Sequence, residues 1–214
     1  MTPPIYERLK EPRWPAFVAM LATSGLYLAL PEPLSLGPAW ALPTVVAVLL
    51  VPILVLDYYR RYHTARILTV IANSLITLAM IGSLALLVKG IPTHLETPKG
   101  LLRSACALWV TNILVFALWY WKLDAGGPLK RAHPDGIARS SFLFPQMLSR
   151  EGEKQAHWQP HFVDYLFLAF NTSTAFSPTD TAVLSRPAKL GMMLQSVISL
   201  LIVALLAARA VNIL

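Results

Sequence analysis

The sequence is poor in charged residues and has a single cysteine. Only 14% of its 214 residues are charged, whereas 56% are hydrophobic. Soluble domains carry about 25% charged residues, so this chain has too few polar side chains to cover a soluble fold of its length. We therefore expect the lipid bilayer to be its solvent. The lone cysteine, Cys106, excludes an intramolecular disulfide and a cysteine-based metal cluster.

Motifs of common enzymes and cofactor sites are missing as well. The sequence has no glycine-rich phosphate loop, no His-Glu-x-x-His and no nucleophile elbow, so we assign no catalytic residue and no cofactor. His157 and His161 are four residues apart, but Pro160 disrupts the helix that would align them, and a metal site needs further ligands. Basic residues are scattered over short connections, which argues against a nucleic-acid partner.

Long apolar runs dominate the sequence instead. Five of them approach or exceed the roughly 20 residues needed to cross about 30 Å of hydrocarbon, and a sixth is shorter. The N-terminal "MTPPIYERLKEPRW" lacks a signal-peptide pattern, so we expect the first run to be retained as a membrane helix. The runs predict an all-α membrane protein, a polytopic helical bundle in a single domain over residues 1–214. Its six segments are 14–30, 39–58, 65–89, 101–122, 158–178 and 188–212, and the fifth is short and partly irregular.

The distribution of Lys and Arg predicts the orientation of these segments. With six full crossings, twelve Lys and Arg fall on the side of the N-terminus and of the long connection 123–157, against five on the other side. The positive-inside rule places the richer side in the cytoplasm. We therefore expect a protein of the bacterial inner membrane whose N-terminus, 123–157 loop and C-terminus are cytoplasmic.

The long connection contains the apolar stretch "SSFLFPQML" between charged patches. This stretch fits either an amphipathic segment on the membrane surface or an ordinary mobile loop. We favour the mobile loop, and we expect no folded soluble domain in this connection.

The stretch "FNTSTAFSPTD", from Phe170 to Asp180, places four consecutive polar residues within the shortest apolar segment. A helix turns 100° per residue, so these four side chains point in different directions and no single packed face shelters them all. Pro178 restricts the residue before it to an extended conformation and is expected to end the helix nearby. Further on, Ser185 is the predicted N-cap of the last helix, with Pro187 in its first turn.

The stretch "YLFLAFNTSTAFSPTDTAVLSRPAKLGMMLQSVISLLIVALLAARAVNIL" resembles the pore helix, filter and inner helix of two-helix potassium-channel pore domains. With "LLRSACALWVTNILVFALWYWKLD" as the outer helix, the resemblance covers residues 101–214. It matches Thr172, Ser173 and Thr174 to the threonine-rich filter strand, and Asp180 to the acidic residue that follows the filter. The implied function is ion passage by a channel-like protein.

The sequence departs from that family in the filter and in its charges. "AFSP" stands where the family has Gly-Tyr-Gly, and proline and phenylalanine do not allow the backbone conformation that aims carbonyls at potassium. Potassium selectivity of that type is therefore not expected. A re-entrant loop on the outer face would also leave fourteen Lys and Arg outside and four inside, so a full crossing by 158–178 fits the charges better.

Polar residues recur inside the apolar segments and are candidates for a path through the bundle. Segments 65–89, 101–122, 158–178 and 188–212 each carry one amide at moderate depth. The predicted polar path comprises Asn171, Thr172, Ser173, Thr174, Asp180, Gln195, Asn73 and Asn112. The alternative is that these side chains only form hydrogen bonds between helices.

Charged residues near the ends of segments are a second set of candidates. Asp57 and Asp164 lie near the predicted cytoplasmic ends, and Arg209 lies near the end of the last segment. We expect Arg209 to form an ion pair with one of the two acids, and proton handling is the alternative role.

These patterns lead to three functional hypotheses. The first is a channel- or transporter-like protein that passes a small inorganic ion or solute at the junction of the fifth and sixth segments, in the bilayer and as a homo-oligomer. The second is a membrane scaffold or assembly partner that transports nothing. The third, an intramembrane enzyme, has few ionisable residues within the segments to support it.

Overall fold

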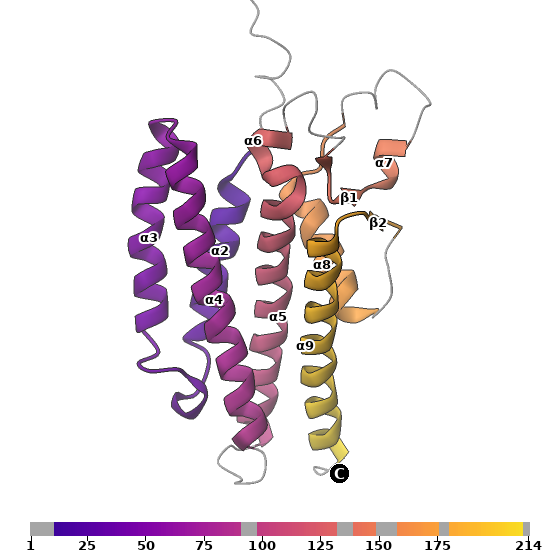
Figure 1. The fold of residues 1–214 in the computed structure, drawn as a ribbon. Coiled ribbons are helices and arrows are strands. Elements are labelled where there is room, and N and C mark those ends of the chain that lie inside the picture. The colour runs from indigo at the N-terminus through magenta and orange to yellow at the C-terminus, as the bar shows by residue number, and fades with distance from the viewer. Residues whose placement is uncertain (1–10, 91–97, 132–138, 149–157, 176–179, 212–214) are drawn as a thin grey trace, which may run out of the picture. The chain divides into compact units, whose positions relative to one another are not determined.

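A computed structural model describes residues 11–90, 98–131, 139–148, 158–175 and 180–211 (Figure 1). These residues form helices connected by short turns, with one two-stranded sheet. In chain order the elements are α2 (Trp14–Tyr27), η1 (Glu32–Leu34), α3 (Ala41–Tyr58), α4 (Tyr62–Gly90), α5 (Pro98–Leu123), η2 (Asp124–Gly126), α6 (Pro128–Arg131), β1 (Phe142–Leu143), α7 (Pro145–Leu148), α8 (Phe162–Thr174), β2 (Ala182–Val183) and α9 (Arg186–Val211).

Within the described ranges, four helices are long and apolar enough to cross a membrane. The candidate spans are Ala41–Tyr58, Tyr62–Gly90, Gly100–Gly126 and Arg186–Ala207. They confirm the prediction of a helical chain with several membrane-compatible segments. The helices α2 and α8, of 14 and 13 residues, are shorter. At 1.5 Å per residue each rises about 20 Å, less than the roughly 30 Å of the hydrocarbon core.

The chain divides into two compact units. One contains residues 1–16 and 116–197, and the other contains residues 17–115 and 198–214. Helices α5 and α9 each contribute one end to the first unit and the other end to the second.

The second unit is built on a hairpin of α3 and α4, which pack against each other. Pro52 lies inside α3 without ending it. The segment after α2 also packs on α4, because the side chain of Leu36 occupies the space that a side chain at Gly82 would need. The hydroxyl of Tyr27 accepts a hydrogen bond of 2.6 Å from the backbone N–H of Leu36, which fixes this segment to the end of α2.

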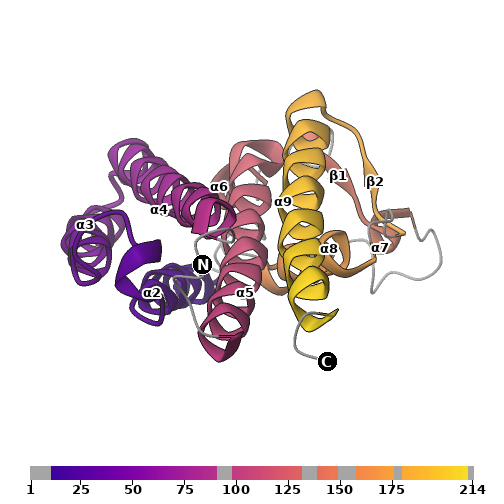
Figure 2. The ribbon, with the colours of Figure 1, turned by 90° about the horizontal axis from the view of Figure 1, so that it is seen from below.

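The first unit has an aromatic core between α5, β1 and α8. The rings of Tyr120 and Phe142 lie 5.3 Å apart, and those of Phe144 and Tyr165 lie 5.5 Å apart, both edge to face. Strand β1 pairs with β2 in antiparallel register, Phe142 opposite Val183 and Leu143 opposite Ala182. Figures 1 and 2 both show α8 beside α9 in this unit.

The mobile loop predicted for "SSFLFPQML" is wrong for its described residues. Phe142 and Phe144 are buried, at 0% and 4% exposure, and the stretch contains strand β1. The expectation of an amphipathic surface segment does not fit either, because the aromatic side chains pack on Tyr120 of α5 and Tyr165 of α8. Aromatic side chains bury large apolar areas, so these two phenylalanines fix the connection to the helices.

Candidate functional site

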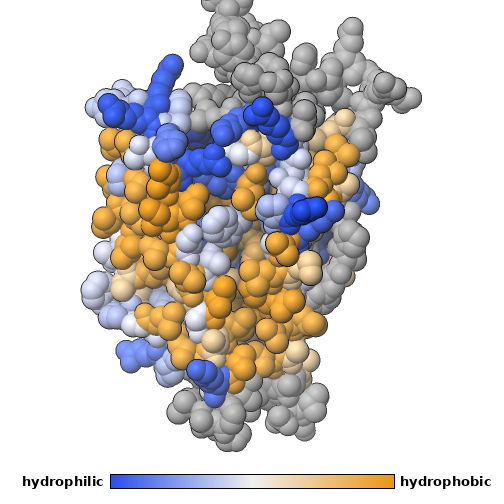
Figure 3. All heavy atoms as spheres, in the orientation of Figure 1, coloured by the Kyte–Doolittle hydropathy of each residue, from blue (hydrophilic) through white to orange (hydrophobic). Residues whose placement is uncertain are grey.

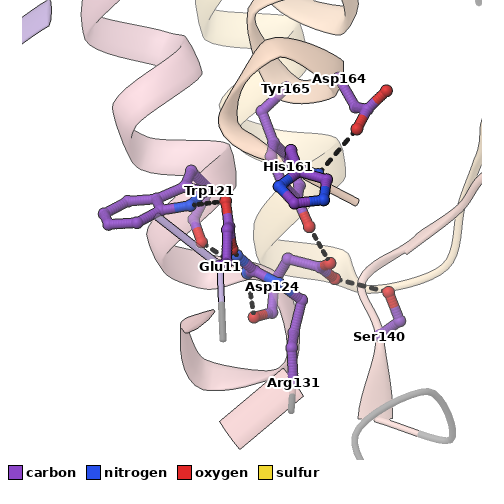
Figure 4. Close-up of polar contacts among 8 residues, drawn as sticks. All are labelled: Glu11, Trp121, Asp124, Arg131, Ser140, His161, Asp164 and Tyr165. Atoms are coloured by element: carbon purple, nitrogen blue, oxygen red, sulfur yellow. Dashed lines mark hydrogen bonds and ion pairs between the residues drawn. The ribbon is translucent and has the colours of Figure 1, made fainter. Parts of the chain in front are cut away.

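The centre of the first unit is Asp124, at the end of α5. Its carboxylate is fully buried and accepts hydrogen bonds from the Ser140 hydroxyl at 2.6 Å and from the Ser141 backbone N–H at 2.5 Å through Oδ1. The Tyr165 hydroxyl donates to Oδ2 (Figure 4). Asp124 thereby ties together η2, the residues around β1 and the first turn of α8. A buried carboxylate needs such donors, because it would otherwise lose its hydration without replacement.

Arg131 satisfies the carbonyl groups at the same end of α5. One guanidinium nitrogen, Nη1, donates to the backbone carbonyls of Trp121 at 2.7 Å and Asp124 at 3.1 Å. These carbonyls lie at a helix C-terminus, where intrahelical donors run out and a cation is favoured. The turn that brings Arg131 back contains Ala125 and Gly127 at φ 49° and 103°, a left-handed conformation that glycine adopts readily.

Glu11 neutralises Arg131 from the N-terminal segment. Its Oε2 lies 2.7 Å from Nη2 of Arg131, and its Oε1 accepts a 2.6 Å hydrogen bond from the indole N–H of Trp121 (Figure 4). Both partners of this ion pair are only 5% exposed in their side chains. The pair therefore joins the residues before α2 to the end of α5.

Tyr165 contacts both Asp124 and Arg131. Its hydroxyl donates to Asp124, and the guanidinium carbon of Arg131 lies 5.0 Å from the centre of its ring. Burial raises the pKa of the Tyr165 phenol well above its usual range; the Arg131 charge opposes this shift and Asp124 adds to it. The phenol is therefore a hydrogen-bond donor that keeps its proton.

Gln195 forms a second buried cluster that connects α5, α8 and α9. Its Oε1 accepts a 2.5 Å hydrogen bond from the Tyr120 hydroxyl, and its Nε2 donates to the Ala169 carbonyl at 2.7 Å and to the Ser173 hydroxyl at 2.9 Å. Gln195 and Tyr120 are both fully buried. The amide oxygen and the amide nitrogen both have partners, so this residue fixes the C-terminal half of α8 to its two neighbours.

The contacts of α8 also fix how deep this helix reaches. Its first turn contacts Asp124 at the end of α5, and its last turn contacts Gln195, which lies near the middle of the candidate span Arg186–Ala207. After α8 the chain returns to pair β2 with β1 immediately before α9 begins. Helix α8 thus runs from the end of α5 to the level of Gln195, and β2 lies back at the end from which α8 starts, an arrangement that differs from the continuous crossing predicted for residues 158–178.

The stretch "NTST" continues α8 as a regular helix that ends at Thr174. Thr172 and Ser173 are buried, and the Thr172 hydroxyl donates to the Leu168 carbonyl at 2.8 Å. Asn171 is half-buried, whereas Thr174 is exposed. As expected from helical geometry, no single environment holds all four side chains: two are inside the unit, Asn171 is half-buried and Thr174 is exposed. Asp180 is also exposed, and Pro178 lies outside the described residues.

Asn73 and Asn112, the remaining members of the predicted polar path, belong to the other unit. The side-chain amide of Asn112 donates to the Ser199 hydroxyl at 2.7 Å, a hydrogen bond between α5 and α9. Asn73 is buried on α4, and its Oδ1 has no hydrogen-bond partner among the described residues. Among the described residues of the predicted path, a hydrogen bond between side chains joins Gln195 on α9 to Ser173 on α8.

Of the predicted charged residues, Asp164 caps a helix. Asp164 accepts a 2.7 Å hydrogen bond from the His161 backbone N–H, and together they form a capping box at the start of α8. This geometry satisfies helix donors and explains an acid at this position. Asp57 is half-buried in the last turn of α3. The side chain of Arg209 lies outside the described residues, so the ion pair stays a prediction.

The cap predicted at Ser185 is confirmed. Its hydroxyl accepts a 3.3 Å hydrogen bond from the Ala188 backbone N–H, and α9 begins at Arg186. Among the described residues, no group of three or more His, Cys, Asp or Glu side chains could hold a metal ion. His157 lies outside these residues.

Sequence reasoning missed Glu11, Asp124, Arg131 and Tyr165 as the centre of the first unit. The one local signal is the sequence "DAGG" directly after an aromatic helix end, because two glycines allow the sharp turn that carries Arg131 back.

Comparison of the chain with protein-family models, with curated proteins and with solved structures finds no match.

Proposed function

We propose that this chain is a subunit of a channel- or transporter-like membrane assembly that passes a small inorganic ion or solute at the end of α8. The observation that supports this most is the depth of α8. The helix stops beside Gln195, near the middle of the candidate span of α9, and the chain then returns to β2.

A helix end at this depth has a polar surface that lipid cannot satisfy. Thr174 and Ala175 are exposed in the single chain, and the last carbonyls of a helix lack intrahelical donors. Backbone that is not helical is tolerated at membrane depth only where protein buries it or where it lines a water-filled cavity. Half-helix ends of this kind form the substrate and ion sites of many transporters. In a homo-oligomer around a water-filled path, neighbouring subunits bury part of this helix end and water hydrates the rest.

The depth of α8 also changes the proposed topology. In this topology α3, α4, α5 and α9 cross the membrane, and α2 crosses together with the turns that continue it to Leu30. With these five crossings and α8 as a re-entrant helix, fourteen of the eighteen Lys and Arg fall on the N-terminal side. The remaining four are Lys89, Lys99, Arg103 and Arg209. By the positive-inside rule the N-terminus and the start of α8 are cytoplasmic in a bacterial inner membrane. The C-terminus is then on the opposite side, and α8 enters from the cytoplasm, unlike the pore helix of potassium channels.

A scaffold without transport activity is the second candidate. The observation in its favour is that Gln195, Ser173, Thr172 and Asn112 all form hydrogen bonds inside the chain. In this alternative they serve only to hold helices together, with each contact contributing about 0.6 kcal/mol on average.

Cysteine modification during a flux measurement separates the two candidates. In a Cys106→Ser background, Thr174→Cys places a thiol at the exposed end of α8. Thr172→Cys is the matched control, because Thr172 is two residues earlier in the same helix and is buried. Purified protein in liposomes is tested for flux of potassium, sodium, protons and chloride. We expect a cationic thiol reagent to block flux through Thr174→Cys and to leave Thr172→Cys unaffected.

Two results would contradict the transport proposal. One is the absence of flux for all four ions in the wild-type protein, which would favour the scaffold. The other is flux that persists unchanged after complete labelling of Thr174→Cys, which would remove the end of α8 from the path.

A further inference from the structure

The turn between α3 and α4 exposes two aromatic and two cationic side chains next to each other. Tyr58, Tyr59, Arg60 and Arg61, here called the Tyr-Arg turn, are all exposed, with Tyr58 at 83% and Tyr59 at 69%. The two tyrosine rings contact each other edge to face at 5.5 Å. Figure 3 shows hydrophilic residues gathered where α3 and α4 join, next to the apolar flank of these helices. The turn belongs to the unit that does not contain Gln195.

If α3 and α4 cross the membrane, the Tyr-Arg turn lies at the boundary between lipid and water. The candidate span Ala41–Tyr58 ends at the first residue of the turn, and the candidate span Tyr62–Gly90 begins directly after it. Tyrosine is enriched at the level of lipid headgroups because its ring is apolar and its hydroxyl is polar. Arginine binds phosphate oxygens through two parallel N–H groups. The chemistry of the turn therefore matches the phosphate of a lipid headgroup.

Neither guanidinium of the turn has a partner within the described part of the chain. The hydrogen bonds of Arg60 and Arg61 are made by backbone groups. Their N–H groups donate to the carbonyls of Asp57 at 3.1 Å and Leu56 at 2.8 Å, and the Arg61 carbonyl accepts from the Ala65 N–H at 3.2 Å. Both charged groups remain available for a ligand. The sequence around the turn has an excess of positive charge, because Asp57 is the one acid near three arginines, Arg60, Arg61 and Arg66.

The backbone of Arg60 is a second, independent observation. The hydrogen bonds from the Arg60 N–H to the Asp57 carbonyl and from the Arg61 N–H to the Leu56 carbonyl form the Schellman pattern that ends a helix. Arg60 occupies the left-handed position of this pattern, at φ 57°. Glycine is strongly preferred there because a Cβ atom is strained in this conformation. A strained residue at an exposed position points to a role for its side chain, since the fold alone would be better served by glycine.

We propose that the Tyr-Arg turn binds the phosphate group of an anionic phospholipid in the leaflet that it faces. The guanidinium groups of Arg60 and Arg61 hold the phosphate, and the tyrosine rings lie among the headgroups beside it. This proposal does not depend on transport at α8.

The test is a lipid titration of the full-length protein in neutral detergent, measured by native mass spectrometry. We expect phosphatidylglycerol to bind more tightly than phosphatidylcholine, and Arg60→Gln/Arg61→Gln to weaken phosphatidylglycerol binding about 25-fold, or about fivefold per arginine. The matched control is Lys89→Gln, because Lys89 is an exposed cation at the opposite end of α4 and its loss should leave the affinity unchanged.

Arg60→Gly separates a ligand role from a structural one. Because glycine relieves the strained backbone, we expect this variant to melt at a higher temperature than the wild type and yet to bind phosphatidylglycerol about fivefold more weakly. Equal affinities of wild type and Arg60→Gln/Arg61→Gln for phosphatidylglycerol would overturn the proposal. Displacement of the lipid by inorganic phosphate in moderate excess would also overturn it, since the site would then belong to free phosphate.

Discussion

Replacement of Asp124 by asparagine tests whether the buried carboxylate organises the first unit. The substitution keeps the shape of the side chain but removes its charge and one acceptor oxygen. The Ser141 backbone N–H cannot reorient, so the amide oxygen must take the place of Oδ1, and the amide NH₂ then faces the Tyr165 hydroxyl. The Tyr165 hydroxyl, which donates a hydrogen bond to Asp124 in the wild type, must then accept one from the amide NH₂.

The expected loss of stability follows from the three close hydrogen bonds to Asp124, from Ser140, Ser141 and Tyr165. Hydrogen bonds to charged groups contribute about 1.5–3 kcal/mol and neutral ones about 0.5–1.5 kcal/mol. Each of the three bonds therefore weakens by about 1 kcal/mol, and Asp124→Asn should destabilise the protein by about 3 kcal/mol. For a chain of this length that corresponds to a fall in melting temperature of about 6–12 °C.

Thermal unfolding in detergent, followed by tryptophan fluorescence, measures this effect. The matched control is Asp180→Asn, because Asp180 is exposed and its substitution should change the free energy of unfolding by less than about 0.5 kcal/mol. A melting temperature of Asp124→Asn equal to or above that of the wild type would refute the reasoning. It would mean that the cost of burying the charge exceeds what its hydrogen bonds return.

Three further predictions concern other parts of the structure. Gln195→Leu removes three buried hydrogen bonds and should lower the free energy of unfolding by about 2 kcal/mol at about 0.6 kcal/mol per contact; a chemical unfolding curve that coincides with that of the wild type would contradict this. Because the folded protein raises the pKa of Tyr165 above its unfolded value of 10.0, the stability that this phenol contributes is complete below pH 10 and falls as the pH rises further. As the pH rises through 10, the melting temperature should therefore fall less steeply for Tyr165→Phe than for the wild type. The same dependence of melting temperature on pH in both proteins would contradict this prediction. In a Cys106→Ser background, Ser185→Cys should react with an impermeant thiol reagent from the cytoplasmic side alone; reaction from the outside in intact cells would reverse the proposed orientation.

The helices that are long and apolar enough to cross a membrane were predictable because their signal is local. Each of α3, α4, α5 and α9 is a continuous apolar run, and hydrocarbon selects such runs residue by residue. The cap at Ser185 was predictable for the same reason, since a capping side chain bonds to a backbone group three residues away. The separate directions of Asn171 to Thr174 followed from helical geometry alone.

The path of the chain around α8 was not predictable in this way. The sequence around "NTST" is compatible with a crossing or with a return, and charge counting favoured the crossing. The return depends on the pairing of Phe142 with Val183 and on the contact between Ser173 and Gln195. These pairs are 41 and 22 residues apart, and two-residue strands leave no periodic pattern in the sequence.

By itself, then, the sequence determined which segments suit a membrane and where one helix begins, because those properties depend on neighbouring residues. Only the tertiary structure decided which polar side chains are inside and what they hold. Glu11 meets Arg131 across 120 residues, and Asp124 meets Tyr165 across 41. Each of these groups is stable in the interior only because its partner is there too, and no local pattern encodes a partner at such a distance.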